Sequence, residues 1–519
     1  MLAKVLSGAN VALDAVPVTI EVDIALQGLP SFTIVGLADR AVEESKERVR
    51  SAIRNSGSDF LSKKITINLA PADLPKMGPS YDLPIALGLL LASGQIPYIN
   101  PKKLNLNETL VVGELSLDGN LRRTQGVLPM ATLAKQMGLK RIIVPKENGQ
   151  EAAVVGNLEV LAFESLQEVV KVMLGQTNTQ PVKNKKINLS NNRKFEYDFS
   201  QVKGQESTKR ALEIAASGGH NVLLKGPPGA GKTMLARAFP SILPEMSLDE
   251  AIEVTKIYSI SGKLPSGQSL IIARPFRSPH HTASYIGLIG GGNSIRPGEI
   301  SLAHRGVLFM DEIPEFPRQV LEALRQPLED KEITISRASG SLTFPANFIL
   351  MAAQNPCPCG FLGDKKRNCS CMPGQISKYQ RRISGPLLDR VDIYLEVPSV
   401  EVEKLSGDII SESSDVVRDR VNKARKIQAA RFKDLPNGRQ GRILTNSQMG
   451  SDEIKKYCQI SEEGLNLLKM AISSLNLSAR GYTRVLKLAR TIADLTESEN
   501  ILTEHIAEAL QYRSRDELH

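Results

Sequence analysis

The chain contains the run Gly226-Pro227-Pro228-Gly229-Ala230-Gly231-Lys232-Thr233, which follows the apolar residues 221–225 and precedes a segment of helical character, 234–239. This order predicts a strand, a glycine-rich loop and a helix. Glycines let backbone N–H groups approach a phosphate chain closely, and the N-terminus of the following helix adds partial positive charge. In such a loop the lysine reaches the β- and γ-phosphates and the threonine hydroxyl holds Mg²⁺. A Gly/Pro-rich turn is the alternative, but the full pattern is rarely accidental in this context. We therefore expect the chain to bind a nucleoside triphosphate, ATP, together with Mg²⁺.

Length and composition set limits on the class of protein. The chain has 519 residues, which suggests about three domains. Its formal net charge of +9 permits a polyanionic partner such as DNA without showing one. The strongest apolar run, 83–92, is too short to span a bilayer, so we expect no membrane association and a cytoplasmic protein. Four of the five cysteines lie in one short segment, unlike the disulfide framework of a secreted protein.

Changes of pattern along the chain predict an α/β multidomain protein. Residues 1–175 alternate strand-like and helical runs and are expected to form a separate α+β domain, and the polar residues 176–194 are expected to be a linker. The glycine-rich loop belongs to a domain expected over 195–399, and helix-spaced apolar positions predict a helical region over 400–519. In the first domain the expected strands are 18–24, 31–35 and 64–69, and the expected helices are 38–55, 82–93 and 127–138.

A second strand-like run, 306–310, ends in Asp311-Glu312. In an α/β sheet this is the edge where ligands bind. Hydrolysis requires one carboxylate for the metal and another for the attacking water, so Asp311 is expected to hold Mg²⁺ and Glu312 to polarise the water. Alone, an apolar run that ends in Asp-Glu is also a common way to terminate a strand. Its position after the glycine-rich loop favours the catalytic interpretation.

A third strand-like run, 348–353, is followed by Gln354-Asn355-Pro356. The amide of Asn355 at a buried strand tip can orient the attacking water near the γ-phosphate, although Asn before Pro is also a common turn. Farther on, Arg390 lies in the segment 384–392. An arginine here can stabilise transition-state charge in the site of a neighbouring subunit, whereas alone it would be an ordinary salt-bridge residue.

These parts, in this order, resemble the AAA+ ATPases, and more closely the branch that contains the magnesium chelatase ATPase subunit and the MCM helicases. The resemblance implies that 226–233 is the Walker A loop of a P-loop α/β domain. It further implies that Asp311 and Glu312 are the Walker B carboxylates and that Asn355 is sensor 1.

The same resemblance assigns two arginines. Arg390 matches the trans-acting arginine finger, and Arg484, within the segment 478–490, matches the phosphate contact of the sensor 2 helix. That helix would belong to the C-terminal helical lid. A finger supplied by the next subunit implies a ring, so the resemblance predicts a homo-oligomer, a hexamer.

Two inserts bear on the substrate. The segment 274–284 contains His280-His281, for which we favour loop ordering over a metal site, because adjacent histidines on a rigid strand cannot easily share one ion. The glycine- and arginine-bearing loops that follow resemble the helix-2 insert of the magnesium chelatase branch. Residues 332–344 alternate on both sides of a glycine and predict a β-hairpin. In MCM-like relatives such a hairpin grips DNA, which makes Arg337 a candidate phosphate contact; a solvated hairpin tip is the alternative.

The Cys-rich loop 357–371 contains two close pairs, Cys357 with Cys359 and Cys369 with Cys371. Four thiolates suit tetrahedral Zn²⁺. The C-x-C spacing is less specific than C-x₂-C, so reversible disulfides and free thiols remain alternatives. A bound metal would display the basic residues of the loop beside the nucleotide domain as candidate nucleic-acid contacts. Those residues are Lys365, Lys366 and Arg367.

The N-terminal domain looks like the proteolytic domain of the Lon proteases, an S5-like α+β fold, over the segments 75–81 and 126–148. Ser80 falls where that family keeps its nucleophile, but Leu128 stands where the family has its lysine base. A serine without a base is not activated. Because Lys135 lies too far along the chain to substitute, we expect no peptidase activity.

The complete order of a Lon-like domain, a chelatase-like motor and sensor 2 helices resembles the ComM/YifB group of bacterial proteins over essentially the entire chain. The resemblance implies a hexameric ATPase that drives branch migration of recombining DNA during natural transformation. A chelatase-type or protein-remodelling ATPase that does not act on DNA is the alternative. We expect no tetrapyrrole partner, because the chain offers no metal-sensing, integrin-like segment. Single-stranded and branched DNA are both candidate substrates.

Overall fold

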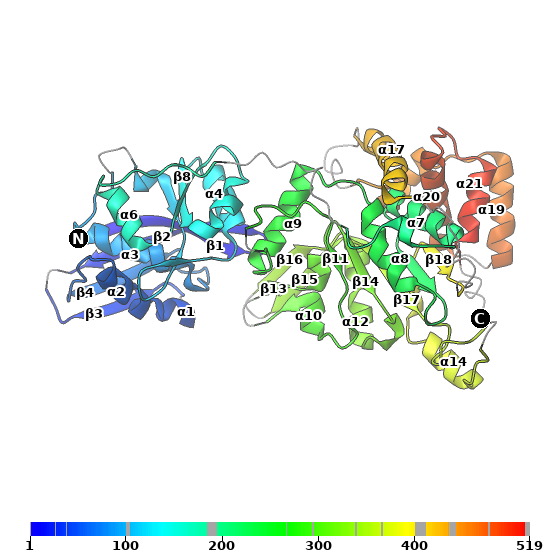
Figure 1. Ribbon diagram of the computed structural model, residues 1–519, viewed down its shortest axis with the longest axis horizontal. Coiled ribbons are helices and arrows are strands. Elements are labelled where there is room, and N and C mark those ends of the chain that lie inside the picture. The colour runs from blue at the N-terminus through cyan, green and yellow to red at the C-terminus, as the bar shows by residue number, and fades with distance from the viewer. Residues whose placement is uncertain are drawn as a thin grey trace.

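The computed structural model describes residues 2–513, apart from 26, 38, 100–103, 184–194, 266, 293–294, 338–339, 365–366, 400–411, 434, 436–442 and 476–477. Figure 1 shows the parts of the chain in sequence order along the long axis: a blue and cyan N-terminal domain, a green central domain and orange to red C-terminal helices. This arrangement confirms the expected mixed α/β, multidomain class. Among the described residues, no helix has both the length and the apolar character needed to cross a bilayer.

The N-terminal domain is built on a mixed sheet with the strand order β3-β4-β2-β1-β5-β8-β9. Its strands are β1 (Leu2–Val11), β2 (Asp14–Ile24), β3 (Ser31–Val35), β4 (Lys64–Ala70), β5 (Thr109–Val111), β8 (Arg141–Pro145) and β9 (Glu159–Phe163), with a small hairpin, β6 (Glu114–Leu115) and β7 (Leu121–Arg122), beside it. Its helices are α1 (Arg40–Glu43), α2 (Ser45–Asn55), α3 (Asp82–Ala92), α4 (Val127–Gln136), α5 (Gly149–Ala153) and α6 (Leu166–Met173). The apolar run 83–92 forms α3, which is buried along its whole length.

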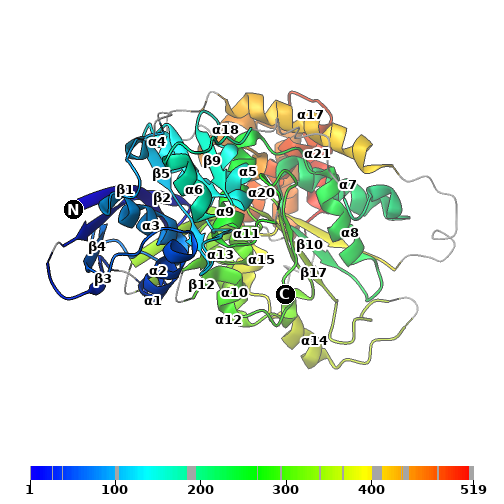
Figure 2. The same ribbon diagram turned by 60° about the vertical axis from the view of Figure 1, so that its left-hand side comes forward.

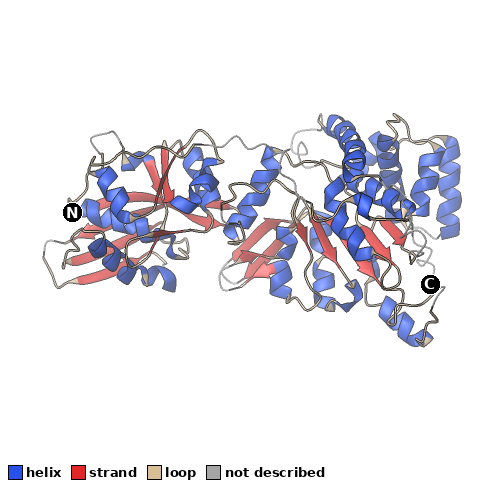
Figure 3. Cartoon of the chain, viewed as in Figure 1, coloured by secondary structure: helices blue, strands red, loops and turns tan. Residues whose placement is uncertain are grey.

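The central domain holds a second sheet with the order β11-β14-β17-β10-β18, in which neighbouring strands are parallel. Its strands are β10 (Val222–Lys225), β11 (Phe276–Arg277), β14 (Val307–Met310), β17 (Ile349–Gln354) and β18 (Ile393–Glu396). The inner strands read as continuous apolar runs because helices cover both faces of the sheet, as Figure 3 shows. The carboxyl ends of β10, β14 and β17 therefore meet at one edge.

The remaining elements of the central domain surround this sheet. Its helices are α7 (Glu206–Gly218), α8 (Lys232–Ala238), α9 (Leu248–Ile260), α10 (Tyr285–Ile289), α11 (Glu299–Leu302), α12 (Arg318–Ala323), α13 (Arg325–Asp330), α14 (Pro373–Gln380) and α15 (Gly385–Leu388). The predicted hairpin is present as the antiparallel pair β15 (Glu332–Arg337) and β16 (Gly340–Pro345). A second, short antiparallel pair is β12 (Gly290–Gly291) and β13 (Arg296–Pro297).

The C-terminal region is helical. It contains α17 (Ser414–Phe432), α18 (Ser451–Tyr457), α19 (Glu462–Leu475), α20 (Ala479–Leu495) and α21 (Thr503–Gln511). In the views of Figures 1 and 2, α17 lies alongside α7 of the central domain. Val421 of α17 and Val485 of α20 share a buried cluster with Val222 and Leu224 of the sheet. The C-terminal helices are therefore packed onto the central domain by a continuous apolar core.

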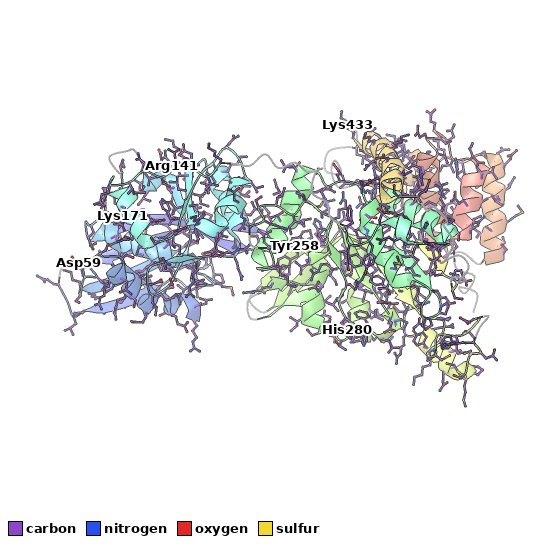
Figure 4. All side chains as sticks on the ribbon, viewed as in Figure 1. Asp59, Arg141, Lys171, Tyr258, His280 and Lys433 are labelled. Carbon is purple, nitrogen blue, oxygen red and sulfur yellow. The ribbon has the colours of Figure 1, made fainter. Side chains whose placement is uncertain are left out.

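The N-terminal domain meets the central domain at α9. Tyr258, labelled in Figure 4, lies on this helix where the two domains adjoin. The buried carboxylate of Glu151 accepts hydrogen bonds from the Ser259 hydroxyl (2.5 Å) and from the backbone N–H of Leu128 (3.1 Å). Burial raises the pKa of Glu151, and its hydrogen bonds oppose that shift. The backbone N–H of Gly126 also donates to the Ser259 carbonyl oxygen at 3.1 Å. A buried polar network thus joins the two domains.

Several features, among them the following, differ from the sequence analysis. The expected helix 38–55 is divided into α1 and α2. The strand β1 was missed because several of its buried positions are small residues (Ala3, Ser7, Gly8 and Ala9) and the apolar alternation is weak. Within the expected linker, the backbone N–H of Val182 donates to the Val160 carbonyl oxygen of β9 at 2.8 Å, so that part of the segment packs on the N-terminal domain.

Candidate nucleotide-binding site

The glycine-rich loop connects the end of β10 to the start of α8. Gly229 and Gly231 have φ values of +76° and +86°, in the left-handed region that side chains rarely adopt. A Cβ atom built at Gly229 would meet no atom within 4 Å, so the loop borders open space there. The two left-handed glycines and the open space beside Gly229 fit a loop that wraps around a phosphate chain.

Lys232 and Asn355 meet because β10 and β17 are neighbouring parallel strands. The Lys232 Nζ atom donates to two carbonyl oxygens of the loop, at 2.7 and 2.9 Å, and to the Asn355 Oδ1 atom at 3.1 Å. Burial lowers the pKa of Lys232, and the carboxylates of Asp311 and Glu312 oppose that shift. The structure thus brings the expected phosphate-binding ammonium group and the expected sensor 1 amide into direct contact.

Asp311 and Glu312 follow β14, the neighbour of β17 on its other side. The Thr233 hydroxyl donates to the Asp311 Oδ2 atom at 2.8 Å, which joins the loop to the acidic pair. Hydroxyl and carboxylate oxygens are ligands that Mg²⁺ prefers, so Thr233 and Asp311 fit this ion. Glu312 is exposed and has a φ of 49°, which is unfavourable for a residue other than glycine. Such backbone conformations are concentrated at functional sites. A carboxylate in this place is suited to act on a water molecule.

The structure adds His281 to this group. Its Nδ1 atom lies 3.9 Å from the Glu312 Oε2 atom. The ring meets the Phe316 ring edge-on, with centroids 6.4 Å apart, and lies against the His280 ring, with centroids 4.1 Å apart. His280, labelled in Figure 4, lies near the lower edge of the central domain in that view. The segment after β11 reaches Glu312 because β11 pairs with β14, and a strand of two residues is too short for sequence periodicity to reveal that pairing.

Arg390 and Arg484 have partners outside the glycine-rich loop. The buried guanidinium group of Arg390 is paired with Glu329 and also donates to the Pro386 carbonyl oxygen. The Arg484 Nη1 atom donates to the Asp392 Oδ1 atom at 2.9 Å, so this arginine joins α20 to the start of β18. The partners described for both arginines stabilise contacts within the chain rather than a phosphate site.

Asp392 is the centre of this second polar group. Its carboxylate also accepts the backbone N–H of Asn221 at 3.0 Å and lies 3.5 Å from the His220 Nδ1 atom. Burial alone would raise the pKa of Asp392, but Arg484 and His220 hold it well below its usual range. Asp392 is therefore charged at neutral pH and links the sheet to the C-terminal helices.

The candidate DNA contacts are only partly described. Lys365 and Lys366 lie outside the described residues. Arg337 is placed by its backbone at the end of β15, paired with Gly340. The Arg367 guanidinium group lies over the Phe361 ring, with its Cζ atom 5.1 Å from the centroid. The hairpin and the Cys-rich loop are therefore present as elements, and their function stays a prediction.

The four cysteines of the Cys-rich loop converge. Their sulfur atoms all lie within 4.8 Å of one another. The Cys357 Sγ atom lies 3.4 Å from that of Cys359 and 3.6 Å from that of Cys369. These distances are much longer than a disulfide bond of about 2.05 Å. The loop therefore presents a compact group of unbonded thiols.

In the N-terminal domain, Ser80 is buried in a short turn, and its carbonyl oxygen accepts the backbone N–H of Gly113. Leu128 is fully buried in a cluster with Val254 and Ile257 of α9. At the position where the sequence analysis expected the Lon-type lysine to be missing, the side chain thus makes an apolar contact with the central domain. The Lys135 Nζ atom donates to the Val155 carbonyl oxygen at 3.0 Å.

Comparison with known proteins identifies the family of the chain. Three family models match: subunit ChlI of magnesium chelatase over residues 20–148, the magnesium chelatase subunit ChlI model over 198–405, and the C-terminal part of that subunit over 411–513. The chain is 44% identical over 512 residues to the YifB protein of Escherichia coli (strain K12), which covers 98% of this chain and 96% of that one. It is also 44% identical over 520 residues to competence protein ComM of Haemophilus influenzae, which covers 99% of this chain and 97% of that one.

A more distant relative is Lon protease 2 of Bacillus subtilis, 30% identical over 176 residues, which is 31% of each chain. The matches to YifB and ComM extend over nearly the whole length of both proteins, and the three chelatase models match parts of the N-terminal, central and C-terminal regions. The chain therefore belongs to the ComM/YifB family of magnesium chelatase-like proteins.

Proposed function

We propose that this protein is an AAA+ ATPase that uses ATP hydrolysis to remodel DNA. The observation that carries the proposal is the meeting of five side chains at one edge of a parallel sheet. They are Lys232, Thr233, Asp311, Glu312 and Asn355. ATP with Mg²⁺ would supply the cleavable phosphoanhydride and the charge that polarises it.

Each side chain has a distinct part in this proposal. Lys232 would bind the β- and γ-phosphates, while Thr233 and Asp311 would hold Mg²⁺. Glu312 would orient and deprotonate the attacking water, with Asn355 fixing the position of the γ-phosphate and that water. This division follows the geometry, since the two metal-binding oxygens are already hydrogen-bonded to each other.

The proposed substrate is DNA, acted on as a branch-migration helicase during natural transformation or recombination. The family relationship to a protein named competence protein ComM supports this choice, as do the β15–β16 hairpin and the net charge of +9. The proposal places the protein in the cytoplasm, where ATP and chromosomal DNA are found. It includes no tetrapyrrole partner and no peptidase activity.

The proposal also includes a ring of identical subunits, a hexamer. In that ring Arg390 would act on the phosphate site of the next subunit, and its ion pair with Glu329 would have to open to release the guanidinium group. Arg484 would in the same way exchange Asp392 for the nucleotide. In the Cys-rich loop, we propose Zn²⁺ as the ion held by the four thiolates.

The decisive experiment is the ATPase rate of the purified full chain with and without single-stranded and branched DNA, with Lys232→Ala as the blank. We expect strong stimulation by DNA that is lost in Lys232→Ala and in Arg390→Ala. Hydrolysis that no DNA changes would instead favour a chelatase-type or protein-remodelling ATPase. Casein hydrolysis that Ser80→Ala abolishes would contradict the non-peptidase part of the proposal.

A further inference from the structure

The sulfur atoms of the Cys-rich loop have the spacing of a single-ion site. Four sulfurs at about 2.3 Å from a tetrahedral ion lie about 3.8 Å apart. The described pairs are 3.4–3.6 Å apart, and all four sulfurs lie within 4.8 Å. The backbone N–H groups of Cys359 and Cys371 point at sulfur atoms, at 3.3 Å and 3.4 Å. Such N–H donors stabilise the negative charge of thiolates that bind a metal.

This site lies next to the nucleotide site in the chain and in space. Cys357 follows Asn355 by two residues, and Asn355 accepts a hydrogen bond from Lys232. The intervening Pro356 carbonyl oxygen accepts the Gln380 side-chain amide of α14 at 3.2 Å. Asn355 and Cys357 therefore follow directly after the end of β17, so that the same strand positions both side chains.

A second contact joins the Cys-rich loop to the glycine-rich loop itself. The backbone N–H of Gly360 donates to the Cys357 carbonyl oxygen at 3.0 Å, which closes a tight turn. A Cβ atom at Gly360 would lie 2.6 Å from the Pro228 Cδ atom and 2.7 Å from its Cγ atom. The turn 357–360, which contains the first two cysteines, is therefore packed against the Pro228 ring of the phosphate-binding loop.

We propose that the four cysteines bind one Zn²⁺ ion and that the metal-bound turn buttresses the phosphate-binding loop, so that loss of the ion weakens nucleotide binding. The inference rests on the proposed ATPase function, because it gives the zinc site a role in binding the nucleotide. Without the ion, the four sulfurs are no longer joined through a shared metal centre that holds the turn together. Gly360 would then no longer be held against Pro228, and the loop would lose a rigid neighbour on that side.

The chain offers a matched pair of glycines to test the contact. Gly360 and Gly363 both have positive φ values, +85° and +77°, in the same loop. A Cβ atom at Gly363 would meet nothing within 4 Å, in contrast to the close approach at Gly360. Gly360→Ala and Gly363→Ala therefore impose a similar backbone cost, but only the first pushes on Pro228.

The experiment measures bound metal by mass spectrometry and the Kd of Mg-ADP by calorimetry, on the full-length protein. We expect one zinc per chain in the wild type and in both alanine variants. Gly360→Ala is expected to raise the Kd about tenfold. This is the lower end of the loss in affinity that follows when residues supporting a binding site are changed. Gly363→Ala is expected to leave the Kd within about twofold of the wild type. Cys369→Ser is expected to lose zinc and to raise the Kd about tenfold, and Cys458→Ser, which lies outside the site, is expected to change neither.

Treating the wild-type protein with a chelator removes the zinc without a substitution, which controls for misfolding of the cysteine variant. Removal of zinc is expected to raise the Kd, and zinc added back is expected to restore it. A wild-type protein that contains no zinc, or one that contains iron instead, overturns the metal assignment. A folded, zinc-free protein with an unchanged Kd overturns the coupling and leaves the proposed function standing. A zinc-loaded wild type that does not bind Mg-ADP refutes the proposed function, and the coupling with it.

Discussion

The Asp392–Arg484 pair gives a quantitative test of how the C-terminal helices are held. Asp392→Asn keeps an oxygen for the Asn221 N–H while it removes the charge that faces Arg484. Both side chains of the pair are largely buried, 12% and 17% exposed, so solvent screens their attraction only weakly. Removing one partner of a buried ion pair costs about 3 kcal/mol. We expect this loss in the free energy of opening of α20, measured by hydrogen exchange of peptides from 479–495.

A double-mutant cycle separates this interaction from nonspecific damage. Arg484→Met is also expected to cost about 3 kcal/mol, and the double variant about 4 kcal/mol, which corresponds to a coupling of about 2 kcal/mol. If the losses of the two single variants add up to the loss of the double variant to within about 0.5 kcal/mol, the reasoning is refuted, because the two side chains then contribute independently. If Arg484 moves to the nucleotide, as the proposed function requires, saturating Mg-ADP will reduce the coupling.

The pH dependence of the same pair has a definite sign. The pKa of Asp392 is lowered in the folded protein, so its stabilising effect is present above the pKa of an unfolded aspartate, about 3.9, and is lost as the pH falls further. The difference in thermal unfolding temperature between the wild type and Asp392→Asn is therefore expected at pH 7 and should shrink below about pH 4. A difference that grows on acidification would contradict this assignment.

Two further predictions concern hydrolysis. His281→Ala is expected to lower the kcat for ATP about tenfold or more with little change in KM, because the ring beside Glu312 would no longer position that carboxylate. His280→Ala is the control, since its described hydrogen-bond partner is Thr282, and an equal effect of both variants would argue against a specific role of His281. Arg390→Ala is expected to reduce the kcat about 10³-fold while Mg-ADP still binds. Glu329→Gln removes the negative charge that faces Arg390 and should leave hydrolysis largely intact; a loss as large as that of Arg390→Ala would mean that the ion pair itself matters.

The sequence predicts best those site residues that follow a strand of the parallel sheet, because their position depends only on where that strand ends. Asp311 and Asn355 come directly after the carboxyl ends of apolar strands, and Lys232 follows the glycine-rich loop that begins at the end of another. Parallel strands bring these ends to one edge of the sheet. Periodicity could not place His281 beside Glu312, because that contact depends on the pairing of the very short strand β11.

The two arginines show a different limit. A family pattern suggested roles for Arg390 and Arg484 towards a phosphate, but it could not indicate their partners within the chain. Glu329 and Asp392 are separated from these arginines by 61 and 92 residues and carry no pattern that marks them as partners. Long-range ion pairs depend on how whole elements pack, and short motifs do not encode that packing.

The junction at α9 has a practical consequence for how the protein can be divided. Val254 and Ile257 of this helix share their apolar cluster with Leu128 and Val154 of the N-terminal domain. A truncated chain that begins near residue 195 would expose that surface to water and leave the Ser259 hydroxyl without the Glu151 carboxylate. The central domain is therefore unsuited to preparation as a separate fragment. The apolar face of α9 is covered by the N-terminal domain in the full chain, and a fragment that lacks this domain would tend to aggregate.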